Sequence, residues 1–246
     1  MARNIYGLDL GTYEIKVYDK KQDSTWKEKN VIAIVDGKEI LAVGDEAYAM
    51  FERTPGNIEV VFPMKEGVIS RFTDMQYLLQ NLLKKERRFT RGSEYLIAVP
   101  TDVTEVEKRA FFDLVVHSTA KAKEVSIVER GVAQCIGMGI RCPEDKGMLI
   151  VDFGAATTEL SVVGSGGMVL NKMLKIGGMT FDVAVQNMVR RNYDFLIGRQ
   201  TAEGFSENVL ECLAETEKLP WWLPDVIWLL VYQDTRKSQA VRYGLR

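Results

Sequence analysis

One short pattern occurs twice in this chain, and it restricts the possible folds more than any other feature. In both copies an apolar strand ends in an aspartate, a glycine follows two residues later, and a second strand begins almost at once. The first copy has Asp9 and Gly11, and the second, about 143 positions further on, has Asp152 and Gly154. A repeat at that spacing indicates two related lobes. We therefore expect the two turns to face each other.

Apolar periodicity predicts the elements around these turns. Strands are expected at 5–10, 14–18, 31–35, 39–43, 95–99, 125–128, 148–152, 159–163 and 168–176. Helices are expected at 73–85, 132–138 and 180–193, with 45–67 as helix fragment and loop. Asp102, with Glu105 three residues later, is a helix start signal for the apolar face from Val103 to Val115. This alternation predicts an α/β fold.

The chemistry of such a turn suits a phosphate group. Glycine has no Cβ, so an anion can approach the backbone N–H groups at Gly11 and Gly154 closely. The Thr12 hydroxyl can donate a hydrogen bond to a phosphate. Asp9 would repel a bare phosphate, so its place in the turn predicts a divalent cation, Mg²⁺ with its water shell, between the two.

These residues resemble the actin, sugar-kinase and heat-shock ATPase superfamily and, within it, the MreB family of bacterial actin homologues. The matching runs are Leu8–Thr12, Ala42–Ala47, Arg53–Asn57, Pro63–Ile69, Val99–Ala110 and Ile197–Glu203. The resemblance implies an actin-like (ribonuclease H-like) ATPase fold with a complete first lobe and a partial second lobe. It places lobe I at 1–146, with a small insertion subdomain at about 31–74, and lobe II at 147–203.

The resemblance also implies a function. Members of this family bind ATP and Mg²⁺ and form membrane-associated cytoskeletal filaments that govern cell shape, with slow ATP hydrolysis coupled to polymerisation. The implied partners are further copies of the chain, the cytoplasmic face of the membrane and the cell-wall elongation machinery. Two alternatives remain open: a non-polymerising regulatory or decaying paralogue, and a small-molecule kinase or other ATPase of the same superfamily.

Transferred position by position, the resemblance assigns a set of nucleotide-binding residues. They are Asp9, Gly11, Thr12, Tyr13, Asp152, Gly154, Thr157, Thr158, Gly177, Gly178 and Glu203. In this assignment Asp9 and Asp152 hold Mg²⁺ through water, and Glu203 meets the ribose hydroxyls. Thr157 and Thr158 also fit an ordinary strand, which favours β-branched residues.

The chain departs from the family pattern where hydrolysis is catalysed. The family has Glu-Glu-Pro there, whereas this chain has Glu129-Arg130-Gly131. The catalytic position falls on Arg130, with Glu129 beside it, and a guanidinium group cannot accept a proton from water, although it can pair with a phosphate. Ala155 and Ala156 replace two glycines of the second turn and are expected to crowd the phosphate. We therefore expect this chain to bind nucleotide weakly or not at all.

Composition excludes several other functions. The net charge of −2 argues against nucleic acid as a partner, because binding DNA or RNA needs a basic surplus. Three cysteines without a C-x-x-C pair indicate neither a zinc site nor a disulfide framework. No signal peptide is recognisable, and no apolar stretch reaches the roughly 18 residues of a membrane-spanning helix. These features predict a cytoplasmic protein.

Two further segments have alternative interpretations. The basic run at 84–91, with Arg88 and Phe89, is either a solvated helix end or a loop that inserts into the membrane surface. The segment 204–246 carries three of the four tryptophans and does not resemble the family. It is expected to be irregular: either a membrane-surface or partner-binding segment, or sequence selected for no fold, as a shifted reading frame would produce.

Overall fold

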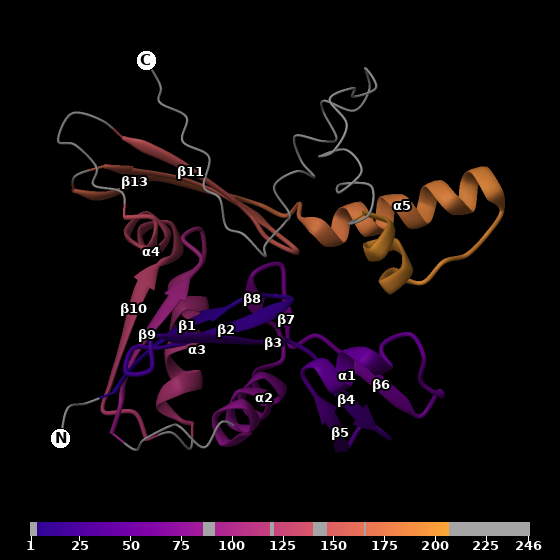
Figure 1. Cartoon of the computed structure of the whole chain (residues 1–246), viewed down its shortest axis with the longest axis horizontal. Helices are drawn as coiled ribbons and strands as arrows, with labels where there is room; N and C mark the ends of the chain where they lie inside the picture. The colour runs from indigo at the N-terminus through magenta and orange to yellow at the C-terminus, as the bar shows by residue number, and fades with distance from the viewer. Residues whose placement is uncertain (1–3, 86–91, 119–120, 140–146, 165, 207–246) are drawn as a thin grey trace.

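The computed structural model describes residues 4–85, 92–118, 121–139, 147–164 and 166–206 (Figure 1). Arg88 and Phe89 lie outside the described residues, as do residues 207–246 of the tail. A helical segment spans residues 199–206, across the expected boundary at residue 203. No helix in the described ranges is both long and apolar enough to span a membrane.

A five-stranded sheet forms the base of the first lobe, in the order β10-β9-β1-β2-β3. β1 pairs in parallel with β9 and antiparallel with β2, and β9 pairs in parallel with β10. The bounds of these strands are β1 (Ile5–Leu10), β2 (Glu14–Asp19), β3 (Ser24–Lys29), β9 (Glu94–Val99) and β10 (Glu124–Glu129). The β1–β2 turn contains Gly11 and follows Asp9 of β1. It lies at the end of the sheet nearest the second lobe (Figure 1).

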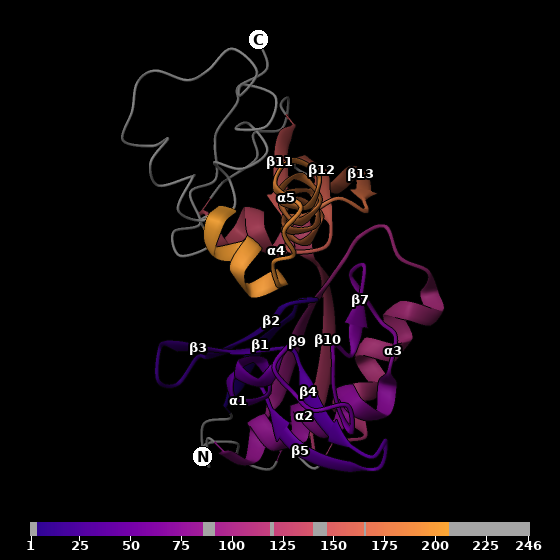
Figure 2. The same cartoon turned by 90° about the vertical axis from the view of Figure 1, so that its right-hand side faces the viewer.

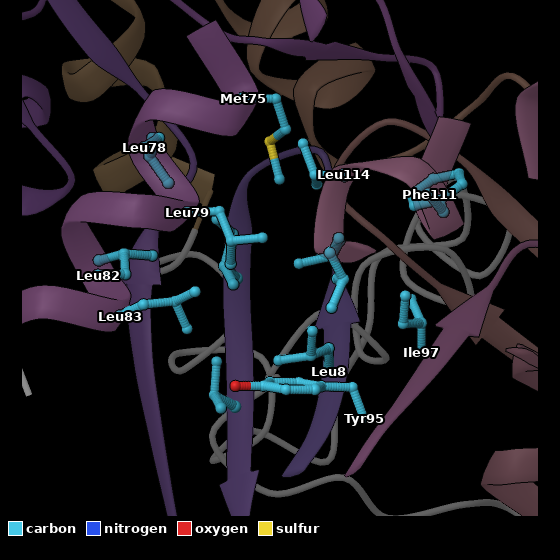
Figure 3. Packing of buried hydrophobic residues seen from close by; sticks show 14 of the residues in the cluster. Leu8, Met75, Leu78, Leu79, Leu82, Leu83, Tyr95, Ile97, Phe111 and Leu114 are labelled. Atoms are coloured by element: carbon cyan, nitrogen blue, oxygen red, sulfur yellow. The ribbon is translucent and has the colours of Figure 1, made fainter. Parts of the chain in front are cut away.

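Two helices, α2 (Phe72–Lys85) and α3 (Glu105–Val116), supply the helical side of the main core of this lobe. Alternate residues of β1 point inward, and the apolar residues of α2 recur every three or four positions, as the two periodicities require. Figure 3 shows Leu79 and Leu114 in the same apolar cluster as Leu8 and Tyr95 of the sheet. The predicted helix at 73–85 is thus observed almost unchanged.

A smaller sheet, β5-β4-β6, stands apart from the main one and is covered by α1 (Asp45–Met50) (Figures 1 and 2). Its strands are β4 (Ile32–Val35), β5 (Glu39–Val43) and β6 (Ile58–Val61). A two-stranded hairpin, β7 (Met64–Lys65) and β8 (Val68–Ile69), links it back to α2. The sequence predicted the β4–β5 hairpin but not β6, which lies between two proline-containing turns.

The second lobe is built on an antiparallel sheet, β11-β12-β13. Its bounds are β11 (Met148–Phe153), β12 (Thr158–Gly164) and β13 (Gly167–Leu174). The short helix α4 (Arg130–Gly137) packs against β12. α5 (Gly178–Tyr193) follows β13 and extends away from the sheet, to the right in Figure 1. α4 therefore bridges the two sheets, because it begins where β10 ends.

The predicted start of α3 is wrong by two residues. Thr104 is the N-cap: its hydroxyl accepts from the Glu107 N–H at 3.2 Å, and the Glu107 carboxylate accepts from the Thr104 N–H at 2.7 Å. Asp102 instead reaches the second lobe, where it accepts from the Met173 N–H at 3.2 Å. Both residues suit a cap by type, so only the fold separates them.

Candidate functional site

The two turns predicted from the repeat have the same geometry. The Gly11 N–H donates to the Glu14 carbonyl at 3.1 Å, and the Gly154 N–H donates to the Thr157 carbonyl at 2.8 Å. A Cβ on Gly11 would lie 2.7 Å from the Glu14 oxygen, and one on Gly154 would lie 2.9 Å from the Thr157 oxygen. Both turns therefore need glycine for the same steric reason.

Arg130 joins the two turns. Its side chain is buried, and its Nη1 donates a short hydrogen bond to the Glu159 carboxylate. Its Nη2 lies 3.4 Å from Asp9 Oδ1. Burial alone would lower the pKa of the guanidinium, but Asp9, Glu159 and Asp152 together raise it, so the group stays charged. Arg130 is thus paired with Asp9 and Glu159, and the charge of Asp152 acts on it in addition.

Local packing brings Arg130 to this place. Glu129 is the N-cap residue of α4, and Arg130 is the first residue of the helix. A Cβ on Gly131 would lie 2.5 Å from Ser161 Oγ and 2.6 Å from Ser161 Cβ, so glycine lets α4 lie directly on β12. Glu159 is the cross-strand neighbour of Asp152 and stands two residues from Ser161.

The charges around Asp9 are already balanced by protein side chains. Besides Arg130, Lys16 places its Nζ 3.9 Å from Asp9 Oδ2. Burial raises the pKa of the Glu159 carboxyl; Arg130 opposes this effect and Asp152 adds to it. The part of the chain that the structure describes holds no group of three or more His, Cys, Asp or Glu side chains placed to bind a metal ion. These residues do not fit a hydrated Mg²⁺, because its position beside Asp9 would also be beside two cations.

A third segment lies between the two turns. The Gly67 N–H, in the β7–β8 turn, donates to Thr12 Oγ1 at 3.0 Å. Gly67 has a φ of +84°, and a Cβ there would lie 3.6 Å from Thr157 Cγ2. Thr12 and Thr157 are thus neighbours of the same glycine. The Thr158 hydroxyl is used elsewhere, since it donates to the Ile176 carbonyl at 2.7 Å.

The start of α5 packs on the second turn. A Cβ on Gly177 would lie 2.6 Å from the Gly154 carbonyl oxygen. The Gly178 N–H donates to the Gly154 carbonyl at 3.1 Å, and the Met179 N–H donates to the Ala155 carbonyl at 2.7 Å. Neither Ala155 nor the following Ala156 has a positive φ, so alanine causes no backbone strain in this turn.

A cavity of about 670 Å³ opens between the lobes beside both turns. Thr12 of the first turn and Ala156 of the second belong to its wall. Its basic lining residues are Lys65, Arg71, Lys175 and Arg199, and its acidic one is Glu66. The volume is in the range of small-molecule sites, and the excess of positive charge suits an anionic ligand.

Glu203, predicted at the ribose, is held by two tyrosines of the first lobe. The Tyr13 hydroxyl donates to its Oε1 and the Tyr48 hydroxyl to its Oε2, each at 2.5 Å. The Lys29 Nζ lies 3.8 Å from the centre of the Tyr13 ring. Burial, and then the bond to Glu203, raise the pKa of both tyrosines. We call Tyr13, Tyr48 and Glu203 the tyrosine clasp.

Sequence reasoning missed several of these residues. Tyr48 and Lys29 carry no local signal, because their role depends on a carboxylate far along the chain. Glu159 could have been noticed, since it is an acidic residue in a strand otherwise read as buried. Its partner Arg130 had already been singled out, but their pairing depends on how α4 packs.

Comparison with known proteins agrees with the fold. A family model described as MreB/Mbl protein matches residues 3–219. The chain belongs to the MreB/Mbl family. The cell shape-determining protein MreB of Escherichia coli K12 is 39% identical over 217 residues, which cover 85% of this chain and 62% of that protein. Mbl of Bacillus subtilis 168 is 34% identical over 205 residues, covering 82% and 61% respectively. The chain thus spans about three-fifths of the length of these relatives.

Solved structures give the fold of this MreB/Mbl family member independently. MreB5 of Spiroplasma citri bound to ADP superposes with a TM-score of 0.76 at 31% identity, over 83% of this chain and 62% of that one. The MamK double helical filament superposes with a TM-score of 0.65 over 84% and 65%, and at 20% identity it shows the fold alone. The predicted actin-like fold with a partial second lobe is confirmed.

Proposed function

We propose that this chain is the nucleotide-binding part of an MreB-type protein that assembles into filaments and takes part in determining cell shape. Two relatives, MreB of Escherichia coli and Mbl of Bacillus subtilis, are named for cell shape determination. MreB5 of Spiroplasma citri was solved with ADP and with AMPPNP. The proposed ligand is therefore an adenine nucleotide, ATP or ADP.

The observation that carries this proposal is the cavity between the lobes. One cavity receives a residue from each glycine turn, Thr12 and Ala156, and its wall holds more basic than acidic side chains. Lys175 is paired with Glu66 and Arg71 with Asp74, so Lys65 and Arg199 supply the excess of positive charge. Backbone N–H groups of tight glycine turns and basic side chains are what a polyphosphate chain requires.

Affinity is expected to be weak. Glu203 already accepts two hydrogen bonds from the tyrosine clasp, so a ribose hydroxyl would compete with Tyr13 and Tyr48 for this carboxylate. No carboxylate occupies the position of Arg130, so hydrolysis by a general base there is not expected. The nucleotide would then serve binding and assembly more than turnover.

The test is a titration of the purified chain with ATP. Calorimetry measures the affinity, and NMR detects the bound ligand. Ala156→Phe fills the cavity and is expected to abolish binding. Ala184→Phe is the matched control, because Ala184 is exposed on α5, and it should bind like the unmodified chain. Absence of any ATP binding, or equal binding by Ala156→Phe, would contradict the proposal.

Self-assembly is a separate part of the proposal. Sedimentation and electron microscopy with and without nucleotide separate a filament-forming protein from a non-polymerising paralogue. The tyrosine clasp and Arg130 are the observations behind the paralogue alternative, because both occupy groups that a nucleotide would use. A phosphotransfer screen with small-molecule acceptors tests the kinase alternative.

The remaining partners also belong to the proposal: the cytoplasmic face of the membrane and the wall-elongation machinery. Arg88 and Phe89 are the proposed membrane residues, because cationic side chains attract anionic lipid headgroups. Co-sedimentation with anionic vesicles should weaken when both are replaced by alanine. Unchanged co-sedimentation would remove the membrane from the proposed partners.

A further inference from the structure

Arg130 is a buried cation at the meeting point of the two turns. Its side chain is 11% exposed, and it is paired with Asp9 on β1 and Glu159 on β12. The negative charge of Asp152 on β11 also raises its pKa. No other described arginine has carboxylate neighbours from both lobes within 4 Å. The aspartates of an actin-like site repel a polyphosphate unless a cation lies near them. In this chain the Arg130 guanidinium is a cation at that position.

The side-chain charges around Asp9 do not favour the binding of a divalent ion. Asp9 has two cationic neighbours, Arg130 at 3.4 Å and Lys16 at 3.9 Å. Glu159 is bonded to Arg130. A hydrated Mg²⁺ beside Asp9 would meet a carboxylate that is already paired with two cations, and it would be repelled by both of them.

The packing beside Arg130 fixes where its side chain lies. The missing Cβ of Gly131 allows α4 to contact Ser161, and this contact brings Arg130 onto Glu159 two residues away on the same strand. Met168 closes the same side, since its Cε would be 2.9 Å from a Cβ on Gly131. The guanidinium is thus held in place by backbone packing and by charge.

We propose that Arg130 takes the place of the divalent cation in this site, so that the chain binds the phosphates of a nucleoside di- or triphosphate without Mg²⁺. The inference rests on the proposed nucleotide-binding function and specifies how the site recognises its ligand. In this arrangement Arg130 neutralises Asp9 and Glu159, which would otherwise repel the phosphate oxygens.

The experiment measures ATP affinity of the whole chain in EDTA and in excess Mg²⁺. For the unmodified chain we expect the same affinity in both buffers. Arg130→Gln should weaken binding in EDTA by roughly tenfold or more, because it removes a charged partner of the phosphate site. Mg²⁺ should restore part of that loss, since Asp9 and Asp152 are then left without the guanidinium.

Two further variants keep the test decisive. Arg130→Lys retains the charge, so its binding should stay independent of Mg²⁺, and it serves if the glutamine variant fails to fold by circular dichroism. Arg109→Gln is the control, because Arg109 is an exposed arginine whose partners, Asp113 and the Phe112 ring, lie on its own helix. It should behave as the unmodified chain.

The outcomes separate this inference from the proposed function. If the unmodified chain binds ATP in neither buffer, the proposed function fails and the inference fails with it. If ATP binds tightly only with Mg²⁺, nucleotide binding stands and the role of Arg130 is refuted. Arg130→Gln binding ATP in EDTA as well as the unmodified chain does would also refute that role.

Discussion

The two glycine turns have the same internal geometry but different support. Behind the first turn, Tyr6, Leu8 and Leu10 of β1 are buried in the main core of the first lobe. Behind the second, β11 contributes Ile150 to a small cluster with Cys135 and Val163, and Val151 is 38% exposed. Local sequence alone is thus enough to form the same turn twice. The apolar core behind each turn depends on residues from other segments of the chain.

The second turn is held mainly by polar and backbone contacts. Arg130 ties Glu159 to Asp9, and the start of α5 donates N–H groups to the carbonyls of Gly154 and Ala155. These contacts come from segments far apart in sequence. The first turn should therefore respond to changes in apolar packing, and the second to changes in charge and backbone fit.

The largest expected effect concerns the apolar support of the first turn. Leu79→Ala removes a fully buried side chain of α2 and should destabilise the first lobe by about 3 kcal/mol. Urea unfolding followed by tryptophan fluorescence measures it. Leu170→Ala on β13 is the matched control, since Leu170 is 59% exposed, and should change stability little. Equal losses in both variants would contradict the comparison.

The glycines themselves test whether the two turns are equivalent. Gly11→Ala and Gly154→Ala each place a methyl group under 3.0 Å from a backbone oxygen and should each destabilise the chain by about 2 kcal/mol. Gly7→Ala is the control, because its new Cβ would make an ordinary contact of 3.6 Å with Tyr18. Thermal unfolding curves for the three variants give the ranking. A harmless Gly154→Ala would show that the second turn relaxes where the first cannot.

The tyrosine clasp tests how the lobes are joined. Tyr13→Phe removes one hydrogen bond to the Glu203 carboxylate and should reduce stability by about 1.5 kcal/mol. Tyr18→Phe, which removes a bond to Asp23 at an exposed position, should have a smaller effect. Urea midpoints compare the two. A larger loss from Tyr18→Phe would argue against the clasp.

The same clasp predicts a pH dependence. The pKa of Tyr13 is raised in the folded chain, so the protonated phenol is favoured there relative to the unfolded chain. Its stabilisation is complete below the ordinary tyrosine pKa of about 10 and is lost as pH rises above it. Stability should therefore fall less steeply above that pH in Tyr13→Phe than in the unmodified chain. Identical slopes in denaturation at alkaline pH would exclude this linkage.

The smallest expected effect separates the two candidate caps of α3. Thr104→Ala should destabilise the first lobe by about 1 kcal/mol, because it removes the N-cap hydroxyl. Asp102→Ala should leave α3 intact and weaken the contact with Met173 and Lys172 of the second lobe. Hydrogen exchange at the first turn of α3 distinguishes them. Faster exchange in Asp102→Ala alone would restore the cap predicted from the sequence.

Local sequence was enough to predict most of the elements and both turns. The apolar spacing from Met75 to Leu83 can form one face of a helix and little else, and glycine after Asp-x allows a tight turn wherever it occurs. β3 escaped prediction because Trp26 is its one large apolar residue. β6 escaped because its four residues lie between two proline-containing turns. The family resemblance came from the same local runs.

The hydrogen-bond and ion-pair partners of the site residues could not be predicted from local sequence. Tyr13 and Glu203 are 190 residues apart, and Arg130 meets Asp9 only because Gly131 lets α4 lie on β12. Periodicity and turn chemistry act over a few residues, whereas ion pairs and hydrogen bonds depend on distance in space. Which cation neutralises Asp9, and which donors hold Glu203, were therefore settled by the packing of the two lobes.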